Sequence, residues 1–218
     1  MGRREPSERT IIRILFVIGI VLFLSEAWKQ WCITFRIGNG SYDVAFFPFQ
    51  LCSIPMYLCL LLPFIKGDRF RKAVLAFLSC FSLLSGIMAF LDTSGFVQYG
   101  WLPLVIHSYA WHVLLIVIGI LSGIQRVLYE GVDGFSGAVI LYLACCLIAE
   151  LLNFVLGRSG FINMFYINPE YDMSQIVFRD IGRTIGNPAV IIFYICMTIT
   201  GAGMIQLIWR LIYRKTRG

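Results

Sequence analysis

The chain has 218 residues, of which 59% are hydrophobic and only 14% are charged, and its mean hydropathy is +0.80. A soluble domain usually carries about a quarter of charged residues, so this composition excludes a water-soluble globular protein. The net charge is +6, but the basic residues form short clusters beside apolar blocks, which argues against a nucleic-acid-binding surface.

Six apolar blocks follow one another along the chain. A membrane-spanning helix needs roughly 20 apolar residues, because the hydrocarbon layer is about 30 Å thick and a helix rises about 1.5 Å per residue. Lipid cannot pair open backbone groups, so the blocks are predicted to be helices. We therefore predict an all-α bundle of six transmembrane helices, forming a single domain over residues 1–218. The predicted spans are about 11–33, 44–65, 70–91, 102–124, 135–157 and 189–212.

The positions of the basic residues predict the orientation of the bundle. Lys and Arg collect at residues 3–13, 66–72, 126 and 210–217, which the alternation of spans places on one side. Cytoplasmic loops retain Lys and Arg, so both termini are predicted to be cytoplasmic. The long connection 158–188 then lies outside, where it would act as a lid. We expect a multi-pass protein of the cell membrane, in a bacterium the inner membrane.

The seven cysteines do not predict a disulfide framework. Six lie within predicted spans, Cys32 lies at the end of one, and none forms a CxxC pair. Spacing typical of a metal site is absent as well. We predict no metal and no cofactor, and most of these cysteines are expected to be small buried residues at helix contacts.

Polar side chains within the predicted spans are the main indication of function. Ionisable groups at membrane depth cost several kcal/mol and normally face a cavity, a partner helix or a substrate. All of those found here fall in the outer half of the bilayer or near its midplane, and the inner halves are almost purely apolar. This distribution favours a pocket open to one side over a pathway across the membrane. The residues are Glu26, Lys29, Gln50, Cys52, Asp92, His107, His112, Glu150 and Asn153.

The second and fourth predicted spans begin alike, with Pro48 and Pro103 in the first helical turn, where a missing N–H is harmless. Equivalent starts would place Cys52 and His107 at one depth. Pro55 is predicted to kink the second span beside Cys52. A histidine close to this thiol would form the Cys–His arrangement of acyl-transfer enzymes. The alternative is that Cys52 is a small packing residue at a kink.

Several pairs are set by helical spacing. His107 and His112 are five residues apart and therefore point about 140° from each other, so one would face Cys52 and the other a neighbour such as Glu26 or Glu150. Ser108 shares a face with His112 and is a second candidate nucleophile. Glu26 and Lys29 are predicted to neutralise each other. Glu150 and Asn153 share a face, as expected for interhelical hydrogen bonds.

Three motifs resemble those of a known family. Phe47–Ser53 (FPFQLCS), the pair His107 and His112 before an apolar run, and Asn163–Pro169 (NMFYINP) are similar to segments of the YwaF-type bacterial integral membrane proteins. The resemblance covers roughly residues 10–210. That family is similar to the eukaryotic transmembrane protein 164, described as a phospholipid acyltransferase, and more distantly to androgen-induced hydrolases of fatty acid esters. Gln50 stands where many relatives have a histidine.

The resemblance implies a lipid acyltransferase or ester hydrolase in which Cys52 is the nucleophile and His112 the base. Its partners would be membrane lipids, either a phospholipid or a fatty-acyl ester. We expect the segment 158–188 to contribute Asn163, Tyr166 and either Arg179 or Arg183 to binding a head group. Two other classes stay open. A transporter or channel would need polar residues in the inner half, and a non-catalytic lipid-binding subunit would keep the pocket without needing Cys52.

Overall fold

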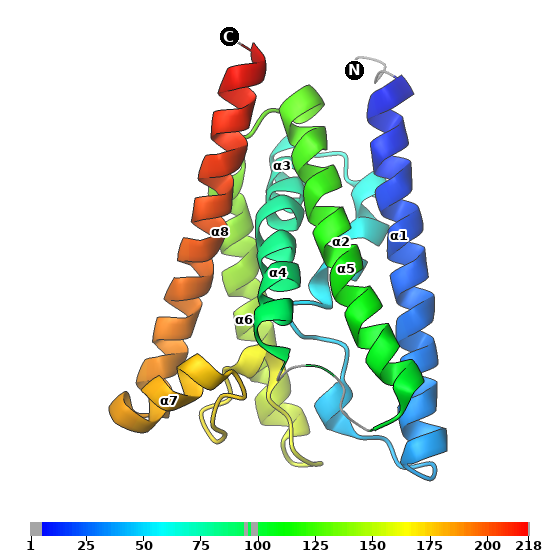
Figure 1. Cartoon of the computed structure of the whole chain (residues 1–218), viewed down its shortest axis with the longest axis vertical. Helices are drawn as coiled ribbons and strands as arrows, with labels where there is room; N and C mark the ends of the chain where they lie inside the picture. Colours follow the sequence, from blue (N-terminus) through cyan, green and yellow to red (C-terminus); the bar gives the residue numbers. More distant parts are fainter. Residues whose placement is uncertain (1–5, 94–95, 97–99, 218) are drawn as a thin grey trace.

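The computed structural model describes residues 6–93, 96 and 100–217, and all the regular elements in these ranges are helical. Within this part of the chain, five helices are long and apolar enough to cross a membrane. They are α1 (Pro6–Trp31) continued by η1 (Cys32–Ile37); the run of α3 (Asp68–Phe77), η4 (Leu78–Ser82) and α4 (Leu83–Leu91); α5 (Leu102–Gln125) continued by η6 (Arg126–Glu130); α6 (Phe135–Leu156); and α8 (Asn187–Arg217). The start of α1 and the end of α8 lie at the same end of the bundle (Figure 1). The chain is an all-helical, multi-pass membrane protein.

The segment predicted as the second span, residues 44–65, is not one continuous helix. It contains the turn η2 (Val44–Phe46), an irregular stretch, the short helix α2 (Ile54–Leu61) and the turn η3 (Leu62–Phe64). The prediction that a helix begins at Pro48 and is kinked by Pro55 is wrong. Pro55 instead occupies the first turn of α2, where its missing N–H has no cost. Residues 47–53 therefore pass through the bundle without helical structure (Figure 1).

The run of α3, η4 and α4 is the most enclosed of the long helices (Figure 1). Its residues Val74, Leu75, Ala76, Phe77 and Leu78 have no exposed surface. Two glycines let α4 and α5 approach closely, as small residues do in membrane bundles. A Cβ atom on Gly119 would lie 3.0 Å from the Cα atom of Leu83, and one on Gly86 would lie 3.1 Å from the carbonyl oxygen of His112. The backbone of α5 at His112 is thus held against α4.

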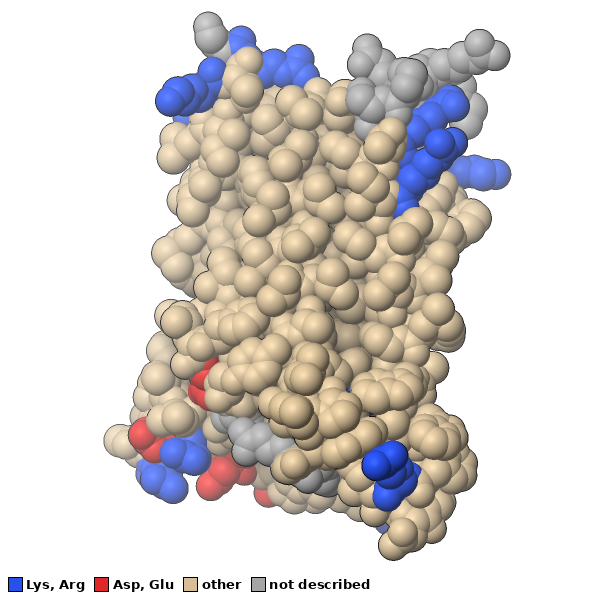
Figure 2. All heavy atoms as spheres, turned by 45° about the vertical axis from the view of Figure 1, so that its right-hand side comes forward, with Lys and Arg blue, Asp and Glu red and all other residues tan. Residues whose placement is uncertain are grey.

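Charged side chains are concentrated at the two ends of the molecule. Figure 2 shows Lys and Arg at the end that carries the termini, both signs of charge at the other end, and a broad band without charge between them. Two arginines of the first end differ from ordinary flanking charges. Arg71 and Arg126 are only 2% and 0% exposed, and Arg71 forms an ion pair with Glu130. Arg126, which the sequence suggested was a flanking charge, is built into the bundle.

Candidate active site

A cavity of about 290 Å³ lies near the end of the bundle opposite the termini. Its walls come from α1, the irregular stretch after η2, the first half of α5, and the connection between α6 and α7 (Ile176–Ile185). Eight of the predicted site residues border it: Glu26, Gln50, Cys52, His107, Ser108, His112, Asn163 and Tyr166. The candidate nucleophile and both candidate bases therefore share one cavity.

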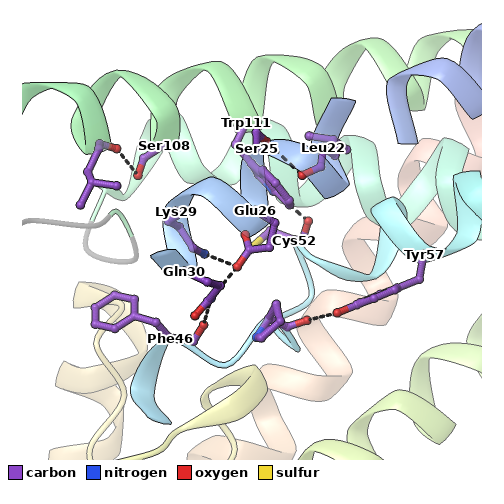
Figure 3. Close-up of polar contacts among 12 residues, drawn as sticks. Leu22, Ser25, Glu26, Lys29, Gln30, Phe46, Cys52, Tyr57, Ser108 and Trp111 are labelled. Carbon is purple, nitrogen blue, oxygen red and sulfur yellow. Dashed lines mark hydrogen bonds and ion pairs between the residues drawn. The ribbon is translucent and has the colours of Figure 1, made fainter. Parts of the chain in front are cut away.

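The break before α2 leaves the backbone at Cys52 without its helical partner. The amide of Met56, which would bond Cys52 in a regular helix, donates instead to the Ser53 carbonyl at 3.2 Å. The indole Nε1 of Trp111 donates to the Cys52 carbonyl oxygen at 3.0 Å (Figure 3). Trp111 comes directly before His112 on α5, so Cys52 is tied to the helix that carries both histidines.

A second bond steadies the same stretch from the side of α2. The phenol of Tyr57 donates to the carbonyl oxygen of Pro48 at 2.8 Å (Figure 3). Together with Trp111, it holds both ends of the irregular backbone that carries Cys52. These two hydrogen bonds thus determine the position of Cys52, because α2 begins only after it.

His112 is 9% exposed and its ring orientation is fixed. Its Nδ1 atom lies 2.7 Å from the carbonyl oxygen of Ser108. A carbonyl can only accept, so Nδ1 must carry the proton, and Nε2 keeps the lone pair that a general base needs. The ring stacks on Phe96, with centroids 4.7 Å apart and an interplanar angle of 19°. The tautomer needed for proton abstraction is therefore favoured.

His107 borders the same cavity but packs toward α1. Its ring lies 5.8 Å from that of Trp28 and 5.6 Å from that of Trp111. Within the described part of the chain its Nε2 atom is buried and has no hydrogen-bond partner. The two histidines diverge as their spacing predicts, and the cavity is wide enough to reach both.

Three residues of α1 form a polar group beside Cys52 (Figure 3). Lys29 Nζ lies 2.8 Å from Glu26 Oε1, as the three-residue spacing predicted. Gln30 Nε2 donates to the same carboxylate oxygen at 2.7 Å and to the carbonyl oxygen of Phe46 at 2.6 Å. The sequence indicated a simple neutralising pair, but Lys29 also borders the cavity. It therefore places a cation, with donors to spare, next to the candidate nucleophile.

Two amide side chains clamp the segment that follows α6. Gln50 donates to the Asn163 carbonyl oxygen at 2.9 Å and accepts from the Phe165 amide at 2.7 Å. Asn153 accepts from the Met164 amide at 2.7 Å. These bonds hold a tight turn in which Phe165 and Tyr166 have φ values of 56° and 58°, a conformation that non-glycine residues rarely adopt.

The clamp changes the expected role of the segment 158–188. Met164 and Phe165 are 0% and 1% exposed, so this part is a plug inserted into the bundle. Asn163 Oδ1 accepts from the Asn168 amide at 3.0 Å and thus stabilises the turn. Tyr166 borders the cavity; burial is the main reason that the pKa of its phenol is raised, so the hydroxyl stays protonated and available as a donor.

Three predicted residues lie away from the cavity walls. Asp92 accepts from the Ile176 amide at 3.0 Å and so caps the start of α7. Glu150 is exposed on α6 and accepts from Asn153 Nδ2 at 3.3 Å, so its predicted contribution to the pocket is wrong. A single sequence gives the depth of Glu150 but not which way its helix face turns. Asn153 acts through the clamp described above.

Ser108 borders the cavity, and its polar atoms have contacts within α5. Its hydroxyl donates to the Leu104 carbonyl oxygen at 3.1 Å, and its own carbonyl oxygen receives the bond from His112. A hydroxyl held by the preceding turn is a weaker candidate nucleophile than the thiol of Cys52.

A second polar cluster lies at the other end of the bundle, where the sequence predicted apolar inner halves. Arg126 Nη1 donates to Ser79 Oγ at 2.6 Å, and Nη2 donates to Gln206 Oε1 at 2.8 Å and to the Val132 carbonyl oxygen at 2.7 Å. Trp209 Nε1 donates to the Ser79 carbonyl oxygen at 3.1 Å. This cluster joins η4, η6 and α8, and the positions of basic residues along the chain gave no sign that Arg126 is buried.

Within the described residues, no group of three or more His, Cys, Asp and Glu lies together as metal ligands would. The model of the TMEM164 family matches residues 1–208 of the chain. No curated protein and no solved structure matches the chain.

Proposed function

The chain belongs to the TMEM164 family, and from this premise and the geometry of the cavity we propose that it is a membrane-embedded lipid acyltransferase or ester hydrolase. Cys52 is the proposed nucleophile and His112 the proposed base. The observation that carries the proposal is that both residues border one cavity, with the His112 Nδ1 atom bonded to a carbonyl oxygen so that Nε2 is free to accept a proton. The acyl chemistry itself is what the sequence resemblance implies.

In the proposed reaction, His112 Nε2 takes the proton of the Cys52 thiol as the sulfur attacks the ester carbonyl of a lipid. The tetrahedral intermediate collapses with cleavage of the C–O bond, and the imidazolium returns the proton to the departing alcohol. A thioester remains on Cys52. Water or a lipid hydroxyl then gives its proton to His112 and attacks the thioester, which releases the acyl product and the thiol.

Two neighbouring residues would support this chemistry. Trp111 fixes the backbone of Cys52, which limits how far the sulfur can move from the histidines. Lys29 carries a positive charge on the cavity wall, where it favours the thiolate and any anionic oxygen of the substrate. His107 would be an alternative base, or would relay a proton on the α1 side of the cavity.

We propose a topology with six crossings, in which the segment 44–65 crosses partly as irregular chain and partly as α2. Both termini would be cytoplasmic, since Lys and Arg gather at that end (Figure 2) and are retained inside. The cavity then opens toward the outer leaflet of a cell membrane, in a bacterium the inner membrane. The lipid partners, either phospholipid or fatty-acyl ester, would enter from that leaflet, and the segment 158–188 would cover the head group.

The test uses the purified full-length protein in vesicles that contain phospholipids and fatty-acyl esters with labelled acyl chains. We expect labelled product, and a labelled thioester on the peptide containing Cys52 when the reaction is stopped with acid. Cys52→Ala should remove both signals. Cys59→Ala is the matched control, because Cys59 is fully buried in α2 and does not border the cavity.

Full turnover by Cys52→Ala would refute the mechanism and make Ser108 the next nucleophile to test. An inactive wild type that still binds lipid in the cavity would instead support a non-catalytic lipid-binding protein.

A further inference from the structure

The short helix α7 has two clearly different faces. Val177, Phe178, Ile181 and Ile185 fall on one side of the helix. Arg179, Asp180, Arg183 and Thr184 fall on the other, together with Ile176, the first residue of the helix. The polar side is well exposed, with side-chain exposures of 67% for Arg183 and 58% for Asp180. Part of the apolar side is exposed as well, since Val177 is 65% and Ile185 49% exposed. In a protein surrounded by water, this apolar area would be costly.

Contacts with α8 establish which way the apolar side faces. The ring of Phe178 lies 5.0 Å from that of Tyr194 and 6.1 Å from that of Phe193. A Cβ atom on Gly182 would lie 3.0 Å from the Val190 side chain. These partners follow the start of α8 at Asn187 by one to two turns, so they lie deeper along the spanning helix. The apolar side of α7 therefore points along the bundle axis toward the centre of the molecule. Its charged side points away from the centre, toward the nearer end of the bundle.

We infer that α7 lies in the head-group layer of the membrane, with Val177 and Ile185 in contact with lipid and Arg179 and Arg183 among the phosphates. The helix runs across the end of the bundle, at the level where α8 begins (Figure 1). On α8, Ile192 lies on a different side from the residues that contact α7 and is itself 65% exposed. Two arginines against one aspartate suit an anionic surface.

The position of α7 has a consequence for the cavity. Asp172 and Ser174, which immediately precede α7, border the cavity, and Asp92 ties the start of α7 to the end of α4. A helix fixed in the head-group layer would hold the cavity's rim at the level where lipid head groups lie. This inference concerns the lipid surface and does not depend on the acyl chemistry of Cys52.

The test compares three introduced cysteines, each labelled with an environment-sensitive fluorophore, in vesicles of phosphatidylglycerol and phosphatidylcholine. Val177→Cys reports the apolar side of α7, Asp180→Cys its polar side, and Ile192→Cys the lipid-facing surface of α8. The parent protein carries Cys52→Ala and Cys196→Ser, because Cys52 borders the cavity and Cys196 is exposed. Because the proposed nucleophile is absent from this parent protein, the labelling result does not depend on the proposed acyl chemistry.

We expect the probe at Val177 to be quenched by lipids with a nitroxide near the head group, several-fold more strongly than by aqueous iodide. The probe at Asp180 should show the opposite order, and the probe at Ile192 should be quenched by a nitroxide deeper in the acyl chain. Equal iodide quenching at Val177 and Asp180 would overturn the inference, since α7 would then lie in water. Protection of Val177 from both quenchers would also overturn it, because protein would then cover that side.

Discussion

The two ends of the bundle both contain buried polar side chains, but these side chains are used differently. Near the termini, the guanidinium of Arg126 is bonded to Ser79, Gln206 and a loop carbonyl. At the opposite end, Lys29, His107 and His112 border a cavity. A polar group that is bonded to several neighbouring elements stabilises a fold, whereas one that faces a cavity is available to a ligand. Burial alone therefore does not identify a site.

The same contrast bears on transport. A pathway across the membrane would need groups that can exchange partners along its whole length. Arg126 instead joins three elements at the terminal end, where the ring of Trp209 also packs so tightly on α5 that a Cβ atom on Gly123 would lie 2.0 Å from it. This arrangement favours a cavity accessible from one end only.

The largest effect is expected from removing the proposed base, His112, at the end of the bundle that holds the cavity. His112→Ala should reduce lipid turnover by about 10²–10⁴-fold, the usual contribution of general acid–base catalysis, with little change in stability. His107→Ala should have a much smaller effect if it only relays protons. The rates of labelled-acyl release in vesicles would give both values.

Combining His112→Ala with Cys52→Ala should be no worse than Cys52→Ala alone, because residues that act as one unit are not additive. A larger loss for His107→Ala than for His112→Ala would exchange their roles. Equal and full activity in both variants would remove the histidines from the mechanism.

At the end of the bundle that carries the termini, we expect substitutions to lower stability and to leave turnover unchanged. Arg126→Ala should lower the free energy of unfolding by about 2–4 kcal/mol, since several hydrogen bonds between elements are lost. Turnover per folded molecule should stay near the wild-type value. Reversible unfolding in mixed micelles measures the first quantity, and activity normalised to monodisperse protein measures the second.

Arg126→Lys is the matched control, because it keeps the charge but can bond fewer of the partners, so it should fall between the wild type and Arg126→Ala. A large loss of turnover by correctly folded Arg126→Ala would connect the two ends and contradict the comparison.

The sequence predicted the long helices well, because uninterrupted apolar blocks leave little choice in a bilayer. It also placed Glu26, Cys52, His107 and His112 at a common depth, and the structure brings them to one cavity. The prediction failed for Glu150, where depth in the membrane does not determine whether a side chain faces the cavity. Glu150 has a suitable depth, but the rotation of α6 directs it outward, and rotation is set by packing that one sequence does not reveal.

The break before α2 and the burial of Arg126 were missed for related reasons. Pro48 and Pro55 were both acceptable first-turn residues, and tertiary bonds from Trp111 and Tyr57 stabilise the irregular chain between them. Counting basic residues near span ends gives orientation, but it treats a buried arginine and a solvated one alike. Contacts between distant segments decided both cases.

Variants of Lys29 should show whether this residue only neutralises Glu26 or also acts on the thiol or the substrate. Their effect is expected to be smaller than those of the variants above. Lys29→Met removes the partner of Glu26, which is 4% exposed, so it should destabilise the fold because a buried carboxylate loses its neutralising charge. The double variant Glu26→Gln with Lys29→Met removes both charges and should recover most of that stability. We expect turnover to stay low in the double variant if Lys29 acts on the thiol or the substrate. Recovery of both stability and turnover would make the pair purely structural.

The smallest expected effect concerns the bond between Trp111 and Cys52. Trp111→Phe keeps an aromatic ring but removes the donor to the Cys52 carbonyl oxygen, and a single interhelical hydrogen bond contributes about 0.6–1.7 kcal/mol in membrane proteins. Stability should therefore fall only slightly. Because the freed backbone would let the Cys52 sulfur move relative to His112, kcat should decrease by several-fold while KM changes little. Trp101→Phe is the control, since Trp101 packs against Arg36 and Trp28 and has no bond to Cys52. Identical kinetics for the two variants would show that Trp111 only fills space, and the position of Cys52 would then rest on Tyr57 and the clamp formed by Gln50.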